Sequence, residues 1–367
     1  MRIERFTNLY RDVTKEGTKI PQEKYCLTGQ FPIVDQGQRV IAGWWNDDAG
    51  IFKNVPAIIF GDHTRAIKYM EQPFFIGADG VKILRPTNIK DNPKYLYYAL
   101  QAAKIPNLGY SRHFKVVKEL QICIYSRDEQ NEIVRVLEKI DNLIEQRHAE
   151  TTYLDQLVKS RFIELFGDPE QNPMVWTKQP LSEIIINANN GMARRGNDPH
   201  GSIVMRLVEL QDGHIDYSTP NRIVLTDTEK GKYLLRENDF LFARVNGNPE
   251  YVGRCAVFHE IGEPVYHNDH IIRVHFDDTV LNGAFASALI NSAYGKRQMR
   301  GQIKTSAGQY TISQDGIGAI TAILPPMALQ QQFAAFVEQT DKSKLAVQKG
   351  LQELEILKKS LMQQYFG

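Results

Sequence analysis

The most regular hydrophobic pattern of the chain lies in residues 127–167, where apolar side chains recur at steps of three and four residues. This spacing places them on one face of a helix, with charged residues on the other faces. Ser126 and Glu129 have the spacing of a capping box, and Gly167 tolerates the positive φ with which many helices end. The pattern therefore predicts one continuous helix of about 40 residues, on the order of 60 Å long.

The end of the chain repeats this pattern. Shifting the numbering by 200 places residues 330–367 on residues 130–167 without a gap, and nine of the 38 pairs are identical, among them Gln130 with Gln330. We infer an internal duplication in which a body and a long helix each occur twice. A helix that leaves the first body for the second and a helix that returns must run antiparallel, which predicts pseudo-twofold symmetry.

The segments between the helices predict two bodies that mix α and β structure. Short apolar runs bounded by Gly, Asp and Pro indicate strands at 31–34, 40–41, 57–60 and 81–84, and later at 203–207, 222–225 and 239–244. Helices are expected at 93–104, 181–188 and 285–299. The predicted fold is α+β: mixed domains at 1–126 and 168–326, separated by two long antiparallel helices at 127–167 and 327–367. The side chains expected where the helices face each other are Ile133, Leu137, Ile140, Leu154, Leu157, Phe333, Val337, Leu354 and Leu357.

Polar loops at 37–47, 61–65 and 109–115 place Arg or Lys beside Gly and a ring-bearing residue, and polar loops are also expected at 191–198 and 301–311 in the second body. Such loops suit DNA recognition, because Arg reads guanine, Asn or Gln reads adenine, and Lys or a backbone amide holds phosphate. Any one of these cations is more often a solvated surface charge, but their recurrence in equivalent loops of both halves favours a binding role. The candidate DNA-contacting residues are Arg39, Trp44, Arg65, Tyr110, Arg112, His113, Lys115, Arg194, Arg195, Arg244, Asn246, Arg254, Lys304, Thr305, Ser306, Gln309 and Tyr310.

Composition limits the remaining choices. At roughly 150 residues per domain, 367 residues predict two or three domains. The 44 basic and 43 acidic residues give a net charge of +1, so any DNA-binding surface must come from local placement or from a partner. The N-terminal residues contain no apolar core of a signal peptide, no run has membrane-spanning length, and the three cysteines form no CxxC pair. A cytoplasmic protein without disulfide bonds is expected.

No catalytic or metal site is predicted. Residues 92–95 (NPKY) and 248–251 (NPEY) approach the Asn-Pro-Pro-aromatic motif of amino-methyltransferases, but both lack the second proline. The glycine-rich residues 75–80 lie too close to the first fragment for a doubly wound cofactor fold, and ordinary turn chemistry is the favoured interpretation. His267 and His270 have no second ligand cluster at workable spacing, so polar contacts at a strand end are expected rather than a metal site.

The order of these features resembles the specificity subunit of type I restriction–modification systems over the whole chain. The motifs are Leu324-Pro325-Pro326 followed by Gln330-Gln331-Gln332-Phe333, Asp128-Glu129-Gln130 at the start of the first helix, and Lys-Ser with Phe-Gly at the end of both helices. Residues 306–313 (SAGQYTIS) and Trp176 with Leu181-Ser182-Glu183 are similar to recognition domains of that family. The first body departs from the pattern, with Tyr125-Ser126 in place of the two prolines.

The resemblance implies a non-catalytic DNA reader that serves DNA methylation and phage defence. Each recognition domain would read one half of an asymmetric bipartite site in double-stranded DNA, and the helices would set the spacer. Two modification subunits, carrying S-adenosylmethionine, would dock on this chain, and restriction subunits with ATP and Mg would join them; the chain itself would bind no cofactor and no membrane. The alternatives are a coiled-coil scaffold for proteins and, less favoured, a DNA adenine methyltransferase.

Overall fold

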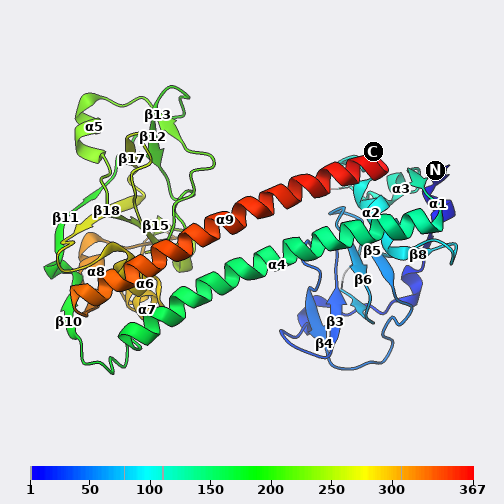
Figure 1. The fold of residues 1–367 in the computed structure, drawn as a ribbon, viewed down its shortest axis with the longest axis horizontal. Coiled ribbons are helices and arrows are strands. Elements are labelled where there is room, and N and C mark those ends of the chain that lie inside the picture. Colours follow the sequence, from blue (N-terminus) through cyan, green and yellow to red (C-terminus); the bar gives the residue numbers. More distant parts are fainter. Residues whose placement is uncertain (1, 78, 110, 307) are drawn as a thin grey trace. The chain divides into compact units, whose positions relative to one another are not determined.

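The computed structural model describes residues 2–77, 79–109, 111–306 and 308–367. The chain forms two compact units. Unit 1 comprises Met1–Ala149 and Gln348–Gly367, and unit 2 comprises Glu150–Val347. Each unit therefore contains one body, the beginning of one long helix and the end of the other. The two long helices are α4 (Arg127–Phe166) and α9 (Met327–Phe366), each 40 residues long (Figure 1).

The described residues of the body of unit 1 form three small sheets. The four-stranded sheet is antiparallel throughout, in the order β2 (Tyr10–Asp12), β8 (Val81–Pro86), β5 (Ala57–Gly61) and β6 (Ile67–Met70). In the three-stranded sheet, β3 (Phe31–Val34) pairs antiparallel with β4 (Gly43–Trp45) and parallel with β7 (Phe75–Ile76). The third sheet joins β1 (Arg2–Arg5) to β9 (Gln121–Ile124). The helices are α1 (Phe6–Leu9), α2 (Pro93–Ala102) and α3 (Phe114–Val117), with 3₁₀ turns η1 (Thr14–Glu16) and η2 (Gln22–Lys24).

The body of unit 2 repeats this topology and adds a sheet. Its four-stranded antiparallel sheet has the order β11 (Ile185–Asn190), β18 (Ile271–Phe276), β14 (Asp239–Ala243) and β16 (Cys255–Val257). Strand β12 (Ser202–Met205) pairs antiparallel with β13 (Arg222–Ile223) and parallel with β17 (Val265–His267), and β10 (Thr177–Pro180) pairs with β21 (Thr321–Leu324). The added sheet has the order β15 (Val245–Asn246), β20 (Gln309–Thr311) and β19 (Lys304–Ser306). The helical elements are η3 (Leu181–Glu183), α5 (Asp227–Tyr233), η4 (Pro249–Tyr251), α6 (Gly283–Asn291), α7 (Ala293–Gln302) and α8 (Gln314–Gly318).

The predicted fold class, two mixed bodies with two long helices, is confirmed. In both units the strand that precedes a long helix pairs with the first strand of the body, as β9 does with β1 and β21 with β10. Helix α4 begins with the predicted capping box, because the Ser126 N–H donates to the Glu129 carboxylate at 2.9 Å and the Glu129 N–H lies 3.5 Å from the Ser126 hydroxyl. Gly167 ends it with a φ of 73°.

Within each unit the two helix segments run antiparallel. In unit 1, Lys358 Nζ lies 2.6 Å from the carboxylate of Asp141. In unit 2, Lys344 Nζ lies 2.7 Å from the carboxylate of Asp155, and the ring of Phe333 contacts that of Phe162 at 5.6 Å. Residues that come later in α4 therefore contact residues that come earlier in α9, as antiparallel helices require. None of the described helices is apolar enough, over a sufficient length, to cross a bilayer.

The side chains predicted for the helix interface divide into two groups. Ile133, Leu137, Ile140 and Phe333 are buried, and Ile133, Leu137 and Phe333 belong to the core of a body. Val337, Leu354 and Leu154 are partly buried, whereas Leu157 and Leu357 are 50% and 47% exposed. The helical stripe thus serves mainly to attach each helix to its body.

Four local predictions were wrong. Residues 40–41 are not a strand, and the strand of that loop is β4. The apolar run after Leu181 is a single 3₁₀ turn followed by strand β11. The helix expected at 285–299 is two helices, α6 and α7, because the Ser292 hydroxyl caps a new helix by accepting the Gly295 N–H. The loop expected at 301–311 contains the hairpin β19–β20.

Candidate nucleic-acid interface

Two loops of unit 1 that carry candidate residues are joined through the buried Asp62, which is 3% exposed. Its carboxylate accepts the Phe114 N–H at 2.7 Å, and its carbonyl oxygen accepts the His113 N–H at 2.8 Å. These bonds fasten the 61–65 turn to the 109–115 loop. Arg65 on the first segment and Lys115 on the second are thereby held in one region.

His113 has a different role from the one predicted. Its side chain is fully buried, its Nδ1 lies 2.9 Å from the Asp62 carbonyl oxygen, and its Nε2 accepts the Leu108 N–H at 3.1 Å. Since a carbonyl oxygen only accepts, Nδ1 is the donor in the first contact, and Nε2 is the acceptor in the second. The ring therefore holds the loop in place and has no atom available to DNA.

The loop of Arg39 is attached to the same region. The Gln36 side-chain oxygen accepts the His63 N–H at 3.3 Å, and the Gln36 carbonyl oxygen accepts the Thr64 hydroxyl. Beneath this loop, Lys68 is 4% exposed and donates to the Asp35 carbonyl oxygen at 2.7 Å. Burial lowers the pKa of Lys68, although the Asp35 carboxylate acts in the opposite direction.

The structure places the remaining candidates of unit 1 as follows. Arg39, Arg112 and Lys115 are exposed. Trp44 is partly buried in β4, opposite Pro32. Arg65 has a φ of 61°, and its guanidinium donates to the Ile105 carbonyl oxygen at 3.3 Å. Tyr110 lies outside the described residues.

In unit 2 the added sheet brings together candidates that are far apart in sequence. Asn246 of β15 stands opposite Tyr310 of β20, which stands opposite Thr305 of β19. Lys304 is one residue away on the same hairpin and makes no ion pair with any described residue. Thr305, Lys304 and Gln309 are exposed, Tyr310 and Asn246 are partly buried, and Ser306 belongs to β19. These residues lie close together because the strand register of this sheet places them opposite one another.

Two arginines adjoin the sheet through the turn that follows β17. The Arg244 guanidinium donates to the Asp269 carbonyl oxygen at 3.0 Å, and the Arg195 guanidinium contacts the Asp269 carboxylate at 2.6 Å and His270 Nε2 at 3.2 Å. The Ile312 N–H, one residue beyond β20, donates to the Arg244 carbonyl oxygen at 2.9 Å. Asp269 and His270 therefore position candidate arginines, a role that the sequence did not indicate.

Arg194 and Arg254 have other partners. Arg194 binds the Glu229 carboxylate at 2.6 Å. Arg254 lies 3.2 Å from the Asp212 carboxylate and 4.5 Å from the centre of the Tyr251 ring. Both guanidinium groups already have carboxylate partners, so DNA phosphate would have to compete with those partners for them.

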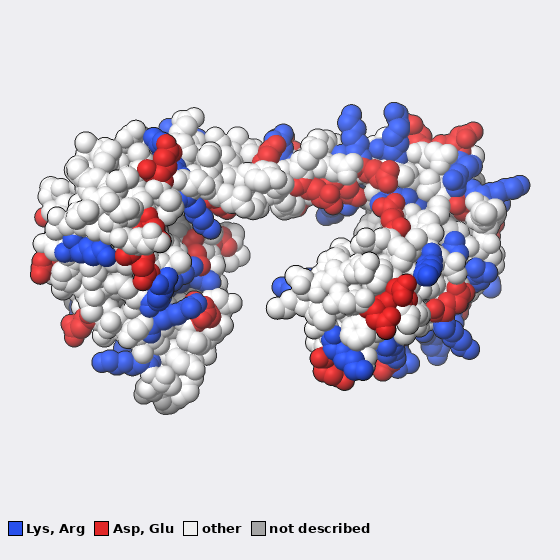
Figure 2. Space-filling model, turned by 90° about the horizontal axis from the view of Figure 1, so that it is seen from below, with Lys and Arg blue, Asp and Glu red and all other residues white. Residues whose placement is uncertain are grey.

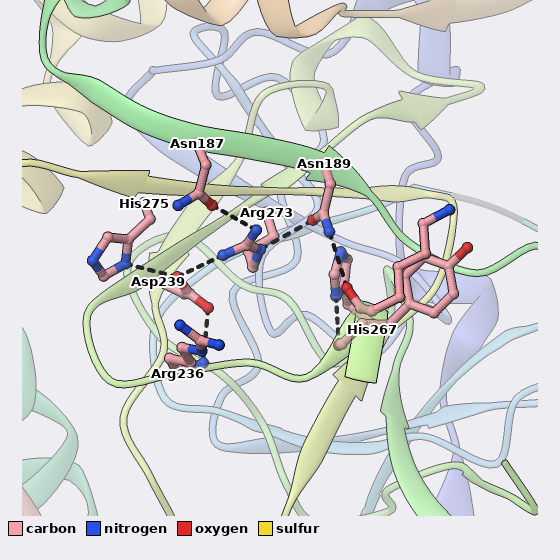
Figure 3. A network of polar contacts seen from close by, with 9 residues as sticks. Asn187, Asn189, Arg236, Asp239, His267, Arg273 and His275 are labelled. Atoms are coloured by element: carbon pink, nitrogen blue, oxygen red, sulfur yellow. Dashed lines mark hydrogen bonds and ion pairs between the residues drawn. The ribbon is translucent and has the colours of Figure 1, made fainter. Parts of the chain in front are cut away.

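A polar network of side chains holds the large sheet of unit 2 together (Figure 3). The Arg273 guanidinium donates to the side-chain oxygens of Asn187 at 2.6 Å and Asn189 at 3.0 Å, both on the neighbouring strand β11. It also reaches the fully buried Asp239 carboxylate at 3.3 Å, which the His275 ring contacts at 2.9 Å. This network ties β11, β18 and β14 together through side chains as well as backbone.

Charge is finely mixed on the visible surface. On the face of each unit seen in Figure 2, Lys and Arg lie among Asp and Glu rather than apart from them. The ion pairs of Arg194, Arg195 and Arg254 with carboxylates are examples of this mixture of charges. A surface of mixed charge exerts only a weak long-range attraction on a polyanion.

The fragments that suggested enzyme chemistry have structural roles. The Asn92 side chain accepts the N–H groups of Lys94 and Tyr95 and so caps α2, and the Asn248 side chain accepts the Glu250 N–H at the start of η4. Both asparagines are therefore helix caps, a local role rather than the turns that were expected. His267 is buried, with Nδ1 donating to the Tyr233 carbonyl oxygen at 3.1 Å. Among the described residues no three His, Cys, Asp or Glu side chains are grouped as metal ligands would be.

Comparisons with known proteins agree with the resemblance seen in the sequence. Residues 11–153 match the family model of the type I restriction modification DNA specificity domain. The chain is 31% identical over 165 residues to the type I restriction enzyme StySPI specificity subunit of Salmonella potsdam, covering 45% of this chain and 36% of that protein. It is 24% identical over 221 residues to the EcoKI specificity subunit of Escherichia coli K12, covering 56% and 47%. The chain thus spans less than half the length of these curated relatives.

Solved structures share the fold over nearly the whole chain. The type I S subunit from M. genitalium is 16% identical, with a TM-score of 0.59 over 100% of this chain and 96% of that one. A chain from a study of the assembly and conformational transition of the type I R-M system is 14% identical, with a TM-score of 0.54 over 99% and 97%. These structures show that the chain shares their fold, and the family model and the curated relatives show the part of the sequence that is similar to type I specificity subunits.

Proposed function

We propose that this chain is a type I specificity subunit, a non-catalytic DNA-reading subunit whose two bodies each read one half of a bipartite site. The observation that carries the proposal is the register of the added sheet in unit 2. It aligns Asn246, Tyr310 and Thr305 on one face of the sheet, and it places Lys304, which makes no ion pair with any described residue, one position earlier on the strand of Thr305. An amide, a ring and a hydroxyl in one row are groups with which proteins read base edges, and a lysine on the same strand is the kind of residue that holds phosphate.

The same proposal assigns partners. Two modification subunits that carry S-adenosylmethionine would dock on this chain, and restriction subunits using ATP and Mg would join the complex. The mixed surface charge supports binding of DNA together with partner subunits. A chain with a net charge of +1 gains little binding free energy from the release of counterions when it binds DNA alone. The place of action would be the cytoplasm, where cellular DNA is available.

Selection from a randomised DNA library tests the proposal. The purified chain is used alone and with the modification subunit, and bound sequences are determined. We expect one bipartite motif, with weak binding by the chain alone and tighter, salt-sensitive binding by the complex. Enrichment of no sequence in either form would refute DNA reading and favour a protein scaffold.

Two substitutions in unit 2 distinguish a residue that recognises a base from a residue that binds phosphate. Lys304→Ala should weaken binding to all sequences alike and reduce the salt slope by about 1, as expected for a phosphate contact. Asn246→Ala should relax discrimination at one base position, at a cost of about 1–3 kcal/mol for the preferred base. The matched control is Lys230→Ala, which removes a lysine of α5 with 47% side-chain exposure. A uniform loss in all three variants would contradict the assignment.

An exchange of one body tests whether each body recognises its own half-site. Replacing residues 1–126 by the equivalent part of another specificity subunit should change one half-site and leave the other half-site and the gap unchanged. An insertion of about one helical turn, four residues, before His148 should change the preferred gap or abolish activity. An unchanged gap with full activity would show that the helices do not set the spacing.

A further inference from the structure

Gln130, near the start of α4, is buried against the body of unit 1 with 1% exposure. Its side-chain oxygen accepts the backbone N–H of Asn92 at 2.7 Å. Its side-chain nitrogen donates to the Tyr125 carbonyl oxygen at 3.0 Å and to the Asp91 carboxylate at 3.2 Å. One amide thus links the start of the long helix, the strand end before it and the start of α2.

Gln330 makes the same contacts in unit 2 and is also 1% exposed. Its oxygen accepts the backbone N–H of Asn282 at 2.9 Å. Its nitrogen donates to the Pro325 carbonyl oxygen at 2.8 Å and to the Val280 carbonyl oxygen at 3.1 Å. The two glutamines are 200 residues apart, as are the carbonyl groups of Tyr125 and Pro325 that they bind.

The residues reached by the glutamines are the caps of the body helices. Asn92 caps α2 and Asn282 caps α6, each with a side-chain oxygen that accepts two N–H groups of the helix. Only a primary amide supplies the acceptor and the two donors that each position uses. Conservation of this chemistry in two bodies of otherwise different sequence indicates a common task.

The end of the other long helix contacts the same body helix. In unit 1 the ring of Phe366 lies 5.3 Å from that of Tyr95, three residues after the cap of α2. In unit 2 the ring of Phe166 lies 4.7 Å from that of Phe285, three residues after the cap of α6. Each body helix is therefore fixed at one end by a glutamine from one long helix and a phenylalanine from the other.

We propose that Gln130 and Gln330 are positioning residues that set the orientation of each body on its helix pair, and thereby the gap at which the two half-sites are read. The inference rests on the proposed DNA-reading function. The two amides act through the caps of α2 and α6 and touch no DNA. Their loss lets the body tilt on its helix, so that half-sites at other gaps are accepted.

Hydrogen exchange of the full chain tests the contact itself, without DNA. Gln330→Leu should raise exchange at the amides of 282–286 at least tenfold, since the variant loses the acceptor of the Asn282 N–H and both hydrogen bonds that the Gln330 nitrogen donates. Gln331→Leu is the matched control, because Gln331 is the exposed neighbour on the same turn. Gln330→Glu, which keeps the shape and the acceptor, serves if the leucine variant does not fold. Unchanged exchange at the cap in a folded variant would overturn the proposal.

A DNA series with different gaps tests the positioning role. Relative affinity is measured for the preferred gap and for gaps one base pair longer or shorter, with the modification subunit present. Gln130→Leu and Gln330→Leu should reduce the preference for the correct gap about tenfold while both half-site sequences remain preferred. A merely less stable protein would lower all affinities equally, and that result would overturn the positioning role. If the wild type prefers no gap, the proposed DNA-reading function is refuted. The hydrogen-exchange experiment then still tests whether the glutamines hold the helix caps.

Discussion

Protonation of His267 should destabilise unit 2 as the pH falls. Its side chain is fully buried in β17, with Nδ1 donating to the Tyr233 carbonyl oxygen. Burial lowers the pKa of His267 from 6.5 to about 4. The folded protein therefore resists a proton that the unfolded chain accepts, and stability present above the unfolded pKa is lost as the pH falls from about 6.5 to about 4.

The magnitude follows from the shift. A difference of 2.5 between 6.5 and 4, at about 1.4 kcal/mol per unit, corresponds to about 3 kcal/mol. The loss should be local at first, because β17 leads directly into Asp269 and His270, which hold Arg195 and Arg244. Acid should therefore weaken the candidate interface of unit 2 before it unfolds the whole chain.

The assay is hydrogen exchange of peptides from β17 and β18, measured from about pH 7 to about pH 4 after correction for intrinsic exchange. The wild type should lose protection steeply below about pH 6. His267→Gln should be less protected at neutral pH, and its opening free energy should change less with pH. If the difference in opening free energy between the two proteins stayed constant across this range, the assignment of the pH dependence to His267 would be wrong.

Three further predictions concern stability and reactivity. Gly253 has a φ of 77°, and a Cβ there would lie 2.2 Å from Met299 Cγ, so Gly253→Ala should cost about 2 kcal/mol or more in thermal or chemical unfolding. Tyr98→Phe removes the hydroxyl that donates to the Asp141 carboxylate at 2.8 Å and should cost about 1–2 kcal/mol by the same measurement; a loss below the error of the assay would contradict this bond's contribution. Burial raises the pKa of the Cys255 thiol to about 12, so a thiol reagent at about pH 8 should label the other two cysteines and leave Cys255 unmodified until unfolding.

Much of the fold could be derived from the sequence because its strongest signals are local or repeated. The capping box of Ser126 and Glu129, the positive φ of Gly167 and the 3.6-residue apolar stripe act within one helix, so their outcome does not depend on the rest of the chain. The duplication predicted two bodies of one topology, and the strand orders of the two four-stranded sheets agree with it.

Where local signals were ambiguous, sequence reasoning failed. The apolar run after Leu181 suits a helix or a strand, and only its pairing with β18 decides for the strand. Residues 301–311 look like a polar loop, yet β15 supplies the third strand that makes β19 and β20 a sheet. From the sequence, His113 resembles an exposed DNA-contacting residue beside Arg112. In the structure its ring is buried, because it forms a hydrogen bond with the carbonyl oxygen of Asp62, 51 residues earlier.

The sequence alone determined that a body and a long amphipathic helix occur twice, and which loops carry cations, amides and rings. Only the tertiary structure decided which of these side chains meet. Asn246 stands beside Tyr310 because of strand register, and Gln130 reaches Asn92 because a buried amide must satisfy its hydrogen bonds with whatever backbone packs against it. Helical periodicity is a property of neighbours along the chain, whereas register and burial depend on segments that folding alone brings together.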